Sequence, residues 1–424
     1  MTQSYGCQQV LLHPNPELQA ILEYACGEAN KVYNCAVYYA RQVWFKERRS
    51  VGRSELFYHL KWNRHFQALF SDAAQQVCSN VLEGFKSFAS LLKLHRQGQL
   101  HFRPKPPSYR KSGGFYTLPY PKRDIKLKEQ GIRCPLGQKV KAWFGIDAFY
   151  IPMPSNLDWD SIRELHILPR NGCFYAQFVY KVETQPVEVD PDQALGIDHG
   201  IDNWLTCVDT QGNSLIVEGR HLKSVNQWYN KRVATLKENQ PQGFWSKQLS
   251  RITERRNRQM KDAVNKAARL VVNHCIERGI GTIVFGWNPG QKQESKLGRK
   301  TNQQFVQIPT ARLKERIKQL CEQYGLRFVE TEESYTSQAS FLDGDSLPTY
   351  GEKPDDWEPS GQRVKRGLYR TGEGYSINAD GNGAANILRK VATTLGLCLE
   401  GVSRGALTTP LRVRFWIAKK SPSL

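Results

Sequence analysis

The stretch "ALGIDHGIDNWLTCVDTQGNSLIVEG", residues 194 to 219, contains three short apolar runs separated by turn residues. Runs of this length that are rich in Ile, Leu, Val, Trp and Thr predict β-strands. The pattern then changes to a long basic helix from about 225 to 279, followed by the strand "GTIVFG" and the helix "TARLKERIKQLCEQYG". The strand "LRFVET" and the helix "NGAANILRKVATTLG" complete the series. The order therefore predicts a mixed sheet with helices on its faces.

Three consecutive strands followed by alternating helices and strands are typical of a ribonuclease H-like domain, which we place at residues 192–424. Upstream, residues 6 to 13 predict a strand and residues 16–100 a helical block, whereas short β runs such as "KVKAWFGI" and "ELHILPRNGCFYAQFVYKV" follow. We expect residues 1–15 and 101–187 to close a small β-barrel into which the helical block is inserted. The fold class is α/β plus β-barrel, and the polar segment "ETQPVEVDPDQA" is the expected boundary.

The composition indicates a partner rich in phosphate. The 424 residues contain 60 Lys and Arg against 40 Asp and Glu, a net charge of +20, together with 46 aromatic residues (Trp 10, Tyr 18, Phe 18). The ten cysteines form no C-x-x-C pair, which argues against a zinc ribbon and a disulfide framework. No signal peptide or 18-residue apolar run is found, so we expect a protein of a prokaryotic cytoplasm with no membrane partner.

Two aspartates stand where metal-dependent phosphodiester chemistry would need them. Asp198 ends the strand "ALGID", and Asp380 begins the last helix in "YSINADGNGAANI". Two divalent cations ~3.5 to 4 Å apart require several carboxylates from different elements. Taken singly, Asp198 also fits a turn residue, and Asp380 a helix cap.

In these residues the chain resembles the TnpB proteins, transposon-encoded RNA-guided DNA nucleases with a split RuvC site and relatives of the type V CRISPR effectors. The resemblance rests on "VYNCAVYYARQ", "AAQQVCSNVLEGFKSFASLL", "FRPKPPSYRKSGGFYTLPYP", "GIDHGIDNWLT", "YTSQ" and "NADGNGAANI", in this order. It implies that the barrel is wedge-like, that the helical block is a recognition domain, and that Asp198 and Asp380 are the first and third RuvC acids.

The chain departs from that family at two points. Gly286, in "TIVFGWNPG" at residues 282 to 290, stands where the resemblance places the second RuvC glutamate. A segment without cysteines, about 337–376, replaces the zinc ribbon, so no zinc is expected. If "LRFVET" lies beside "TIVFG", its end falls ~5 Å away, and Glu332 or Glu333 can supply the missing ligand. Glu333 is favoured because it is in phase with Val329; two solvated loop acids are the alternative. Next to Asp198, His199 is expected to be a turn residue.

Further cations and rings are candidates for contacts to nucleic acid, since Lys and Arg bind phosphates and aromatic rings stack on bases. They lie in the segment from 102 to 123, in the basic helix, and in the segment that replaces the zinc ribbon: Arg103, Lys105, Tyr109, Arg110, Lys111, Lys122, Arg123, Arg251, Arg255, Arg256, Arg258, Arg363, Lys365, Arg366 and Arg370.

We therefore expect an RNA-guided DNA endonuclease that hydrolyses phosphodiester bonds with water as nucleophile. Two Mg²⁺ ions, with Mn²⁺ as a substitute, would be held by Asp198, Glu333 and Asp380. The expected partners are a guide RNA from its own locus and a double-stranded DNA target with a short flanking motif; a partner transposase is a further candidate. One alternative is a nuclease-dead, RNA-guided DNA-binding repressor or targeting factor. Another is a basic RNA-binding or architectural protein without guided recognition.

Overall fold

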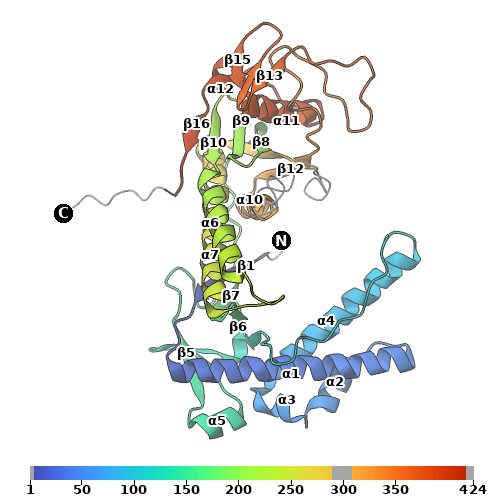
Figure 1. Ribbon diagram of the computed structural model, residues 1–424, viewed down its shortest axis with the longest axis vertical. Helices are drawn as coiled ribbons and strands as arrows, with labels where there is room; N and C mark the ends of the chain where they lie inside the picture. Colours follow the sequence, from blue (N-terminus) through green and yellow to red (C-terminus); the bar gives the residue numbers. More distant parts are fainter. Residues whose placement is uncertain (1–3, 289–307, 417–424) are drawn as a thin grey trace, which may run out of the picture. The chain divides into compact units, whose positions relative to one another are not determined.

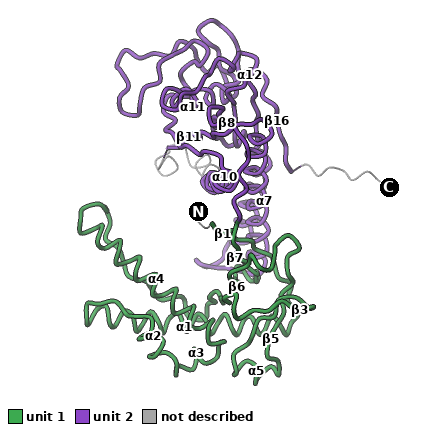
Figure 2. Tube along the Cα trace, turned by 180° about the vertical axis from the view of Figure 1, so that it is seen from behind, with its two compact units in different colours: residues 1–182 green, residues 183–424 purple. Residues whose placement is uncertain are grey.

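The structure, a computed structural model, describes residues 4–288 and 308–416. The chain forms two compact units, residues 1–182 and 183–424, which Figure 2 draws in different colours. The second unit begins at the first residue of the polar segment that the sequence marks as a boundary. Within the described ranges, no helix combines the length and the apolar character that crossing a membrane requires.

The first unit contains a block of helices between its first two strands. The helices are α1 (Pro16–Glu47), α2 (Arg53–Leu60), α3 (Arg64–Ala68) and α4 (Ser71–Arg96), all within the residues predicted to be helical. Asn15 caps α1 by accepting a hydrogen bond from the Leu18 amide at 2.8 Å, which satisfies one of the unpaired N–H groups of the first turn. The long helices α1 and α4 share a buried core and then diverge toward their far ends (Figure 1).

The strands of this unit form two antiparallel sheets. The first has the order β1-β7-β6-β2, from β1 (Ser4–Leu11), β2 (Leu118–Pro121), β6 (Ile162–Arg170) and β7 (Cys173–Val182). The second has the order β3-β4-β5, from β3 (Lys126–Lys128), β4 (Gly131–Pro135) and β5 (Ala148–Ile151), and the short 3₁₀ helix η1 (Lys122–Asp124) precedes it. The N-terminal strand β1 pairs with β7 over its whole length. The helices α1–α4 are therefore inserted, in sequence, between two strands of the same sheet. Closure of the two sheets into one barrel stays a prediction.

One predicted strand of this unit is wrong. Most of "KVKAWFGI" forms the helix α5 (Gln138–Phe144), which ends at Gly145 in the left-handed conformation with φ 68°. Glycine adopts that conformation without the steric cost of a side chain, and so ends helices readily. The alternation of Lys139, Val140 and Lys141 is typical of a strand, but only Val140 of the helix is buried, because α5 lies at the surface of the unit.

A six-stranded mixed sheet forms the centre of the second unit, with the order β12-β11-β8-β9-β10-β16. The strands are β8 (Asp190–His199), β9 (Asn203–Asp209), β10 (Ser214–Glu218), β11 (Ile280–Gly286), β12 (Arg327–Thr331) and β16 (Leu411–Val413). The first three pair antiparallel, whereas β11 runs parallel to β8 and β12 parallel to β11. The expectation that "LRFVET" lies beside "TIVFG" is therefore confirmed.

Helices cover both faces of this sheet. On one face, α7 (Lys247–Glu277) and α10 (Thr310–Tyr324) bury Ile283 and Phe285 of β11 in a large apolar cluster. On the other face, α11 (Ala379–Leu395) packs Ile387 against Val284, and α12 (Arg404–Thr408) lies near it (Figure 1). Alternate residues of β8 and β11 thus face different helices, and this alternation decides which side chains reach the α11 face.

The predicted single helix from 225 to 279 is wrong as well. The structure has two helices, α6 (Arg220–Lys237) and α7, separated by a turn. Asn239 and Gly243 in this turn have φ of 56° and 85°, and Pro241 between them lacks an N–H, so a continuous helix cannot pass. The turn sequence "ENQPQGFWS", residues 238 to 246, contains no basic residue and carries Asn, Pro and Gly, so it was a breaker signal that the prediction of one helix passed over.

The segment without cysteines is ordered as a small antiparallel sheet and two connecting loops. Its strands are β13 (Gln362–Lys365), β14 (Leu368–Arg370) and β15 (Ser376–Asn378), paired in that order. Tyr369 of β14 is fully buried and its hydroxyl donates to the Gln338 carbonyl at 2.7 Å. This contact anchors the sheet to the loop that follows β12.

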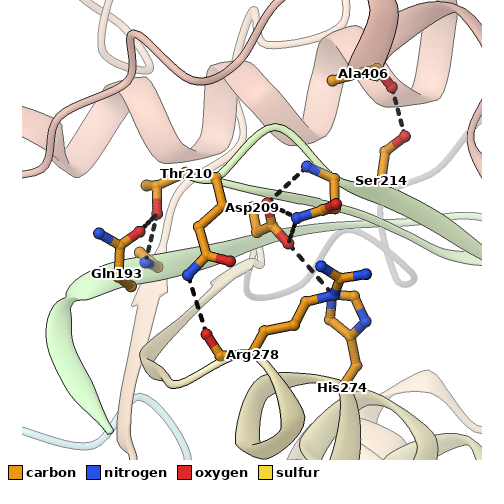
Figure 3. Close-up of polar contacts among 10 residues, drawn as sticks. Gln193, Asp209, Thr210, Ser214, His274, Arg278 and Ala406 are labelled. Atoms are coloured by element: carbon orange, nitrogen blue, oxygen red, sulfur yellow. Dashed lines mark hydrogen bonds and ion pairs between the residues drawn. The ribbon is translucent and has the colours of Figure 1, made fainter.

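Where β9 ends, away from the carboxyl end of β8, buried polar groups stabilise the fold of the central sheet. Figure 3 shows Asp209 at the end of β9, where it accepts a hydrogen bond from the Asn213 amide at 2.7 Å and faces His274 Nε2 of α7 at 3.4 Å. Nearby, the Thr210 hydroxyl donates to Gln193 at 2.7 Å. Because β8 and β9 are antiparallel, Asp209 pairs with Leu195, three residues before Asp198 on β8.

Candidate active site

Asp198 occupies the carboxyl end of β8 on the face that α11 covers. Its place opposite Thr206 of β9 fixes the register, and a Cβ on Gly383 of α11 would stand 3.1 Å from its Oδ2, so the helix approaches the carboxylate closely. Burial raises the pKa of Asp198 well above its usual value, and the negative charges of Glu333 and Asp380 raise it further. A strongly shifted pKa in a cleft marks Asp198 as a candidate functional residue.

Asp380 lies in the first turn of α11, but it is not the cap of that helix. Asn378 is the cap and accepts hydrogen bonds from the amides of Asp380 at 3.1 Å and Gly381 at 2.9 Å. The Asp380 carboxylate is directed elsewhere: its Oδ1 lies 3.0 Å from Arg363 Nη2, and its Oδ2 accepts from Asn203 Nδ2 at 2.7 Å. The Asp380 side chain therefore does not cap the start of α11, and its carboxylate faces the cleft side chains Arg363 and Asn203 instead.

Glu333 fills the space that a side chain at position 286 would enter. Gly286 is the last residue of β11, on the same face as Asp198, and pairs with Thr331 two residues before Glu333. A Cβ built on Gly286 would stand 3.2 Å from Glu333 Oε2 and only 2.5 Å from Ile387 Cδ1. The carboxylate of Glu333 is thus brought from the neighbouring strand to the place of the missing side chain. Pro289 and Gly290 of "TIVFGWNPG" lie outside the described residues.

The backbone around Glu333 is held by groups that the sequence reasoning missed. Asn288 Oδ1 accepts a hydrogen bond from the Glu333 amide at 3.1 Å, and Thr336 Oγ1 donates to the Glu333 carbonyl at 2.8 Å. His199 is not a turn residue: its side chain is buried beside Trp287, and Nε2 lies 3.9 Å from Glu333 Oε2. In the sequence, Asn288 two residues after Gly286 and Thr336 in the loop after β12 were the signals that could have indicated this support.

Glu332 is committed to a different partner. Its carboxylate pairs with Lys390 of α11 and accepts from the Ser334 amide at 2.8 Å. Burial raises the pKa of Glu332, but the hydrogen bonds from Lys390 and Ser334 outweigh this, so the pKa lies below its usual value. The Lys390 side chain is 7% exposed, so Glu332 neutralises a buried ammonium.

The three acids line one cleft with a volume of about 970 Å³. Its wall is formed by residues of β8, the loop after β12, the β13–β14 hairpin and the start of α11, among others. These side chains belong to it: Asp198, His199, Asp202, Asn203, Arg220, Asn288, Glu333, Thr336, Ser337, Arg363, Arg366, Asn378, Asp380 and Arg412. Carboxylates thus meet four arginines in one cleft, a combination that suits a metal ion and a phosphate chain.

The oxygen donors of the cleft are of the kind that a hard divalent cation binds. Carboxylate oxygens are the ligands that Mg²⁺ and Mn²⁺ prefer, and a cation would relieve the repulsion that raises the pKa of Asp198. Within residues 4–288 and 308–416, however, no three His, Cys, Asp or Glu side chains stand ready to hold one ion. Asp380 is instead engaged by Arg363.

A fourth carboxylate at this edge of the sheet escaped the sequence reasoning. Glu218 ends β10 and is 4% exposed. It is surrounded by Arg220 at 3.2 Å, Arg412 at 3.8 Å and Arg414 at 2.9 Å. Three guanidinium groups already neutralise it, so Glu218 is a structural acid that anchors arginines at the mouth of the cleft.

The cations predicted to bind nucleic acid fall into two groups. Several side chains are exposed: Arg103, Lys105, Tyr109, Arg110, Lys111, Arg123, Arg251, Arg255, Arg258, Arg363, Lys365, Arg366 and Arg370. Others are used inside the protein. Lys122 lies on the Trp159 ring and donates to the Trp159 carbonyl, and burial lowers its pKa. Arg256 donates to Asn226 at 2.8 Å between α6 and α7.

Residues 102–116, here named the strap, run along α1 with a turn at residues 111–114, and side chains of that helix hold the backbone at Pro107, Arg110 and Lys111. Asn34 exchanges two hydrogen bonds with the backbone of Arg110, at 2.8 and 3.1 Å. Asn30 donates to the Lys111 carbonyl at 3.0 Å, and Arg41 donates to the Pro107 carbonyl at 3.0 Å. Because the backbone is bound, the exposed side chains of the strap are presented outward.

Two family models match the second unit and the boundary before it. The model described as a probable transposase, OrfB_IS605, matches residues 177–288. The model described as Cas12f1-like, TNB domain, matches residues 311–387, which include the segment without cysteines. The two matches together contain Asp198, Glu333 and Asp380.

Similarity to single proteins extends over most of the chain. A TnpB-like protein, ORF457, of Acidianus two-tailed virus is 21% identical, over 90% of this chain and 85% of its own. The structure of a Cas12f1–sgRNA–target DNA complex contains a chain that superposes with a TM-score of 0.53 and 16% identity, covering 88% of this chain and 83% of that one. At this identity the superposition shows a shared fold, a mixed α/β architecture with several sheets.

Proposed function

The chain belongs to the TnpB family, and on that premise we propose that it is an RNA-guided DNA endonuclease in which Glu333 has taken over from position 286. The observation that carries the proposal is the placement of the Glu333 carboxylate 3.2 Å from the point where a Cβ of residue 286 would lie. The order of the first five strands, β10-β9-β8-β11-β12, supports a ribonuclease H-like, RuvC-type domain. In such a sheet the acids converge at the carboxyl ends of β8 and β12.

The cleft provides the groups that hydrolysis of a phosphodiester requires. Asp198, Glu333 and Asp380 would hold Mg²⁺, which supplies a water nucleophile and neutralises the charge of the transition state. Asn288 and Thr336 fix the backbone at Glu333, and Asn203 orients Asp380. The partners would be a guide RNA from its own locus and a DNA target, as the complex with a similar fold contains sgRNA and target DNA.

The test uses the full chain purified together with RNA expressed from its native locus, matched DNA with a randomised flanking motif, and Mg²⁺. Asp198→Asn, Asp380→Asn and Glu333→Gln should each lower the cleavage rate by more than the ~10- to 100-fold typical of residues that only support a metal ligand. Binding of RNA and DNA should stay within about twofold, since phosphate contacts come from the cationic surfaces rather than from these acids.

Glu332→Gln is the matched control. It removes one negative charge at the adjacent position, yet should reduce cleavage far less than Glu333→Gln, because Glu332 faces Lys390 rather than the cleft. Equal losses in the two variants would refute the assignment of Glu333.

A second candidate function has its own observation. Asp380 is paired with Arg363, and among the described residues no three acids, histidines or cysteines are positioned to hold a metal ion. Such an arrangement is compatible with a nuclease-dead RNA-guided DNA-binding protein, which needs no metal ion for cleavage. Binding of a matched target without any cleavage in Mg²⁺ or Mn²⁺ would favour this function. Purification with only random cellular RNA would instead favour a general RNA-binding protein.

A further inference from the structure

Both oxygens of Asp380 are occupied in the structure. Arg363 Nη2 from the β13–β14 hairpin lies 3.0 Å from Oδ1, and Asn203 Nδ2 donates to Oδ2 at 2.7 Å. The Asn203 Oδ1 in turn accepts from Arg412 Nη1 at 2.9 Å. The positive charge of the Arg363 guanidinium opposes the approach of a metal ion to this carboxylate.

We propose that Arg363 is an internal counter-ion that a divalent cation must displace from Asp380 before the cleft can hold a metal. The inference rests on the proposed function, since it assumes that the three acids hold that cation. A guanidinium and a divalent ion repel each other, so both cannot share the Oδ1 side of one carboxylate. Asn203 is neutral and can remain in place.

The geometry of the pair makes this exchange feasible. One nitrogen meets one oxygen, without the bidentate fork that gives an arginine–carboxylate pair its strength. The Arg363 side chain is 44% exposed and that of Asp380 26%, so water screens the pair and can solvate the released guanidinium. The hairpin would stay attached through buried Tyr369, so that only the exposed end of β13 would move.

Arg366 provides a matched comparison in the same hairpin. It lines the same cleft and is also exposed, but it pairs with Asp202 at 2.6 Å and not with one of the three acids. Arg363→Gln and Arg366→Gln therefore remove the same charge from the same cleft, and only the first removes the competitor of the metal.

The experiment measures Mn²⁺ binding to the purified full chain by electron paramagnetic resonance and calorimetry, without DNA. Arg363→Gln should bind Mn²⁺ about three- to tenfold more tightly than the unmodified chain, because one partly exposed ion pair and one nearby positive charge are removed. Arg366→Gln should change the affinity by less than about twofold, since a more distant charge is screened. Asp198→Asn and Asp380→Asn should weaken binding in all backgrounds.

A second measurement needs no substitution. Hydrogen exchange at Gln362–Lys365 of the unmodified chain should become faster when Mn²⁺ is added, because the tether to Asp380 is released.

The outcomes separate the two proposals. Suppose that Mn²⁺ binds and that the aspartate variants weaken its binding. The counter-ion role is then refuted, and the metal site stands, if Arg363→Gln binds Mn²⁺ no more tightly than Arg366→Gln does. Unchanged hydrogen exchange at β13 has the same consequence. If Mn²⁺ binding is absent, or unaffected by Asp198→Asn and Asp380→Asn, the metal-dependent function is refuted and the counter-ion role with it.

Discussion

A carboxylate on residue 286 would have to enter space that Ile387 and Glu333 fill. The Cβ alone would stand 2.5 Å from Ile387 Cδ1 and 3.1 Å from its Cγ1, distances at which one side must move. The neighbouring Trp287 is not an obstacle, because it lies on the other face of the sheet beside Phe285 and His199. The glycine at position 286 and the Glu333 side chain are thus sterically linked.

This link gives a rescue prediction. Glu333→Ala should lose cleavage, and adding Gly286→Glu together with Ile387→Val should restore a measurable part of it, since valine lacks the Cδ1 atom that stands in the way. Initial cleavage rates in Mg²⁺ provide the measurement. The control is Gly286→Gln with the same two other changes, which has equal bulk but no charge. Equal rates with Gln and Glu would contradict a ligand role for this position.

The segment without cysteines, at about residues 337–376, is held together by carboxylates. Asp345 Oδ2 accepts from the amides of Ser340 at 2.7 Å and Ser360 at 3.0 Å. Asp343 Oδ2 accepts from the Gly372 amide at 2.6 Å and the Ser360 hydroxyl at 3.0 Å. Two acids therefore join three stretches of chain, a role that a metal-binding cysteine cluster performs in other small domains.

We expect Asp345→Ala to loosen this segment, at a cost of about 2 kcal/mol, because two backbone donors lose a charged acceptor. Hydrogen exchange at Ser340 and Ser360 should quicken, whereas Asp355→Ala, a change at an exposed acid of the same segment, should leave exchange unaltered. Removal of metal with a chelator should leave the segment of the unmodified chain folded. Tightly held stoichiometric zinc, lost together with the segment's protection, would contradict this account.

The same acids predict how the segment responds to pH. Burial raises the pKa of Asp343, but its hydrogen bonds with Ser340, Gly372 and Ser360 outweigh this, so the pKa is lower when folded than when unfolded. The stabilisation is therefore present above the ordinary aspartate pKa and is lost as the pH falls through the lower folded value. Hydrogen-exchange protection of the Gly372 amide, which donates to Asp343 Oδ2, should accordingly decline only in acid.

Elements and site differ in how far the sequence could predict them. The strands followed from apolar runs and the choice of Glu333 from strand alternation, since both depend on neighbours along the chain, whereas the strand order came only from the expected fold type. The helix α5 was missed because four alternating residues fit either period. The partners of Asp380, namely Arg363 and Asn203, lie 17 and 177 residues away in sequence, and no local pattern specifies such contacts.

Over the whole molecule, the charge of +20 is partly used within the protein and partly presented to solvent. Lys122, Arg256 and Lys390 serve internal contacts. In contrast, Arg103, Lys105 and Lys111 of the strap are exposed, while α1 holds the strap's backbone. A segment fixed in this way loses little conformational entropy on binding, so its cations are suited to phosphates at fixed spacing.

These properties predict the salt dependence of RNA binding. If the three strap cations each neutralise a phosphate, replacing Arg103, Lys105 and Lys111 by Gln should reduce the slope of log affinity against log salt by about 2, at ~0.7 per contact on single-stranded RNA. Filter binding at several salt concentrations, with RNA from the native locus, gives the two slopes. The control replaces Lys126, Lys128 and Lys139, three exposed lysines outside the strap, and so has the same net charge. Because counterion release depends on local contacts rather than on total charge, the control should keep the steeper slope. Identical slopes in the two triple variants would show that the strap is not a binding surface and that its charge acts only through the overall field of the protein.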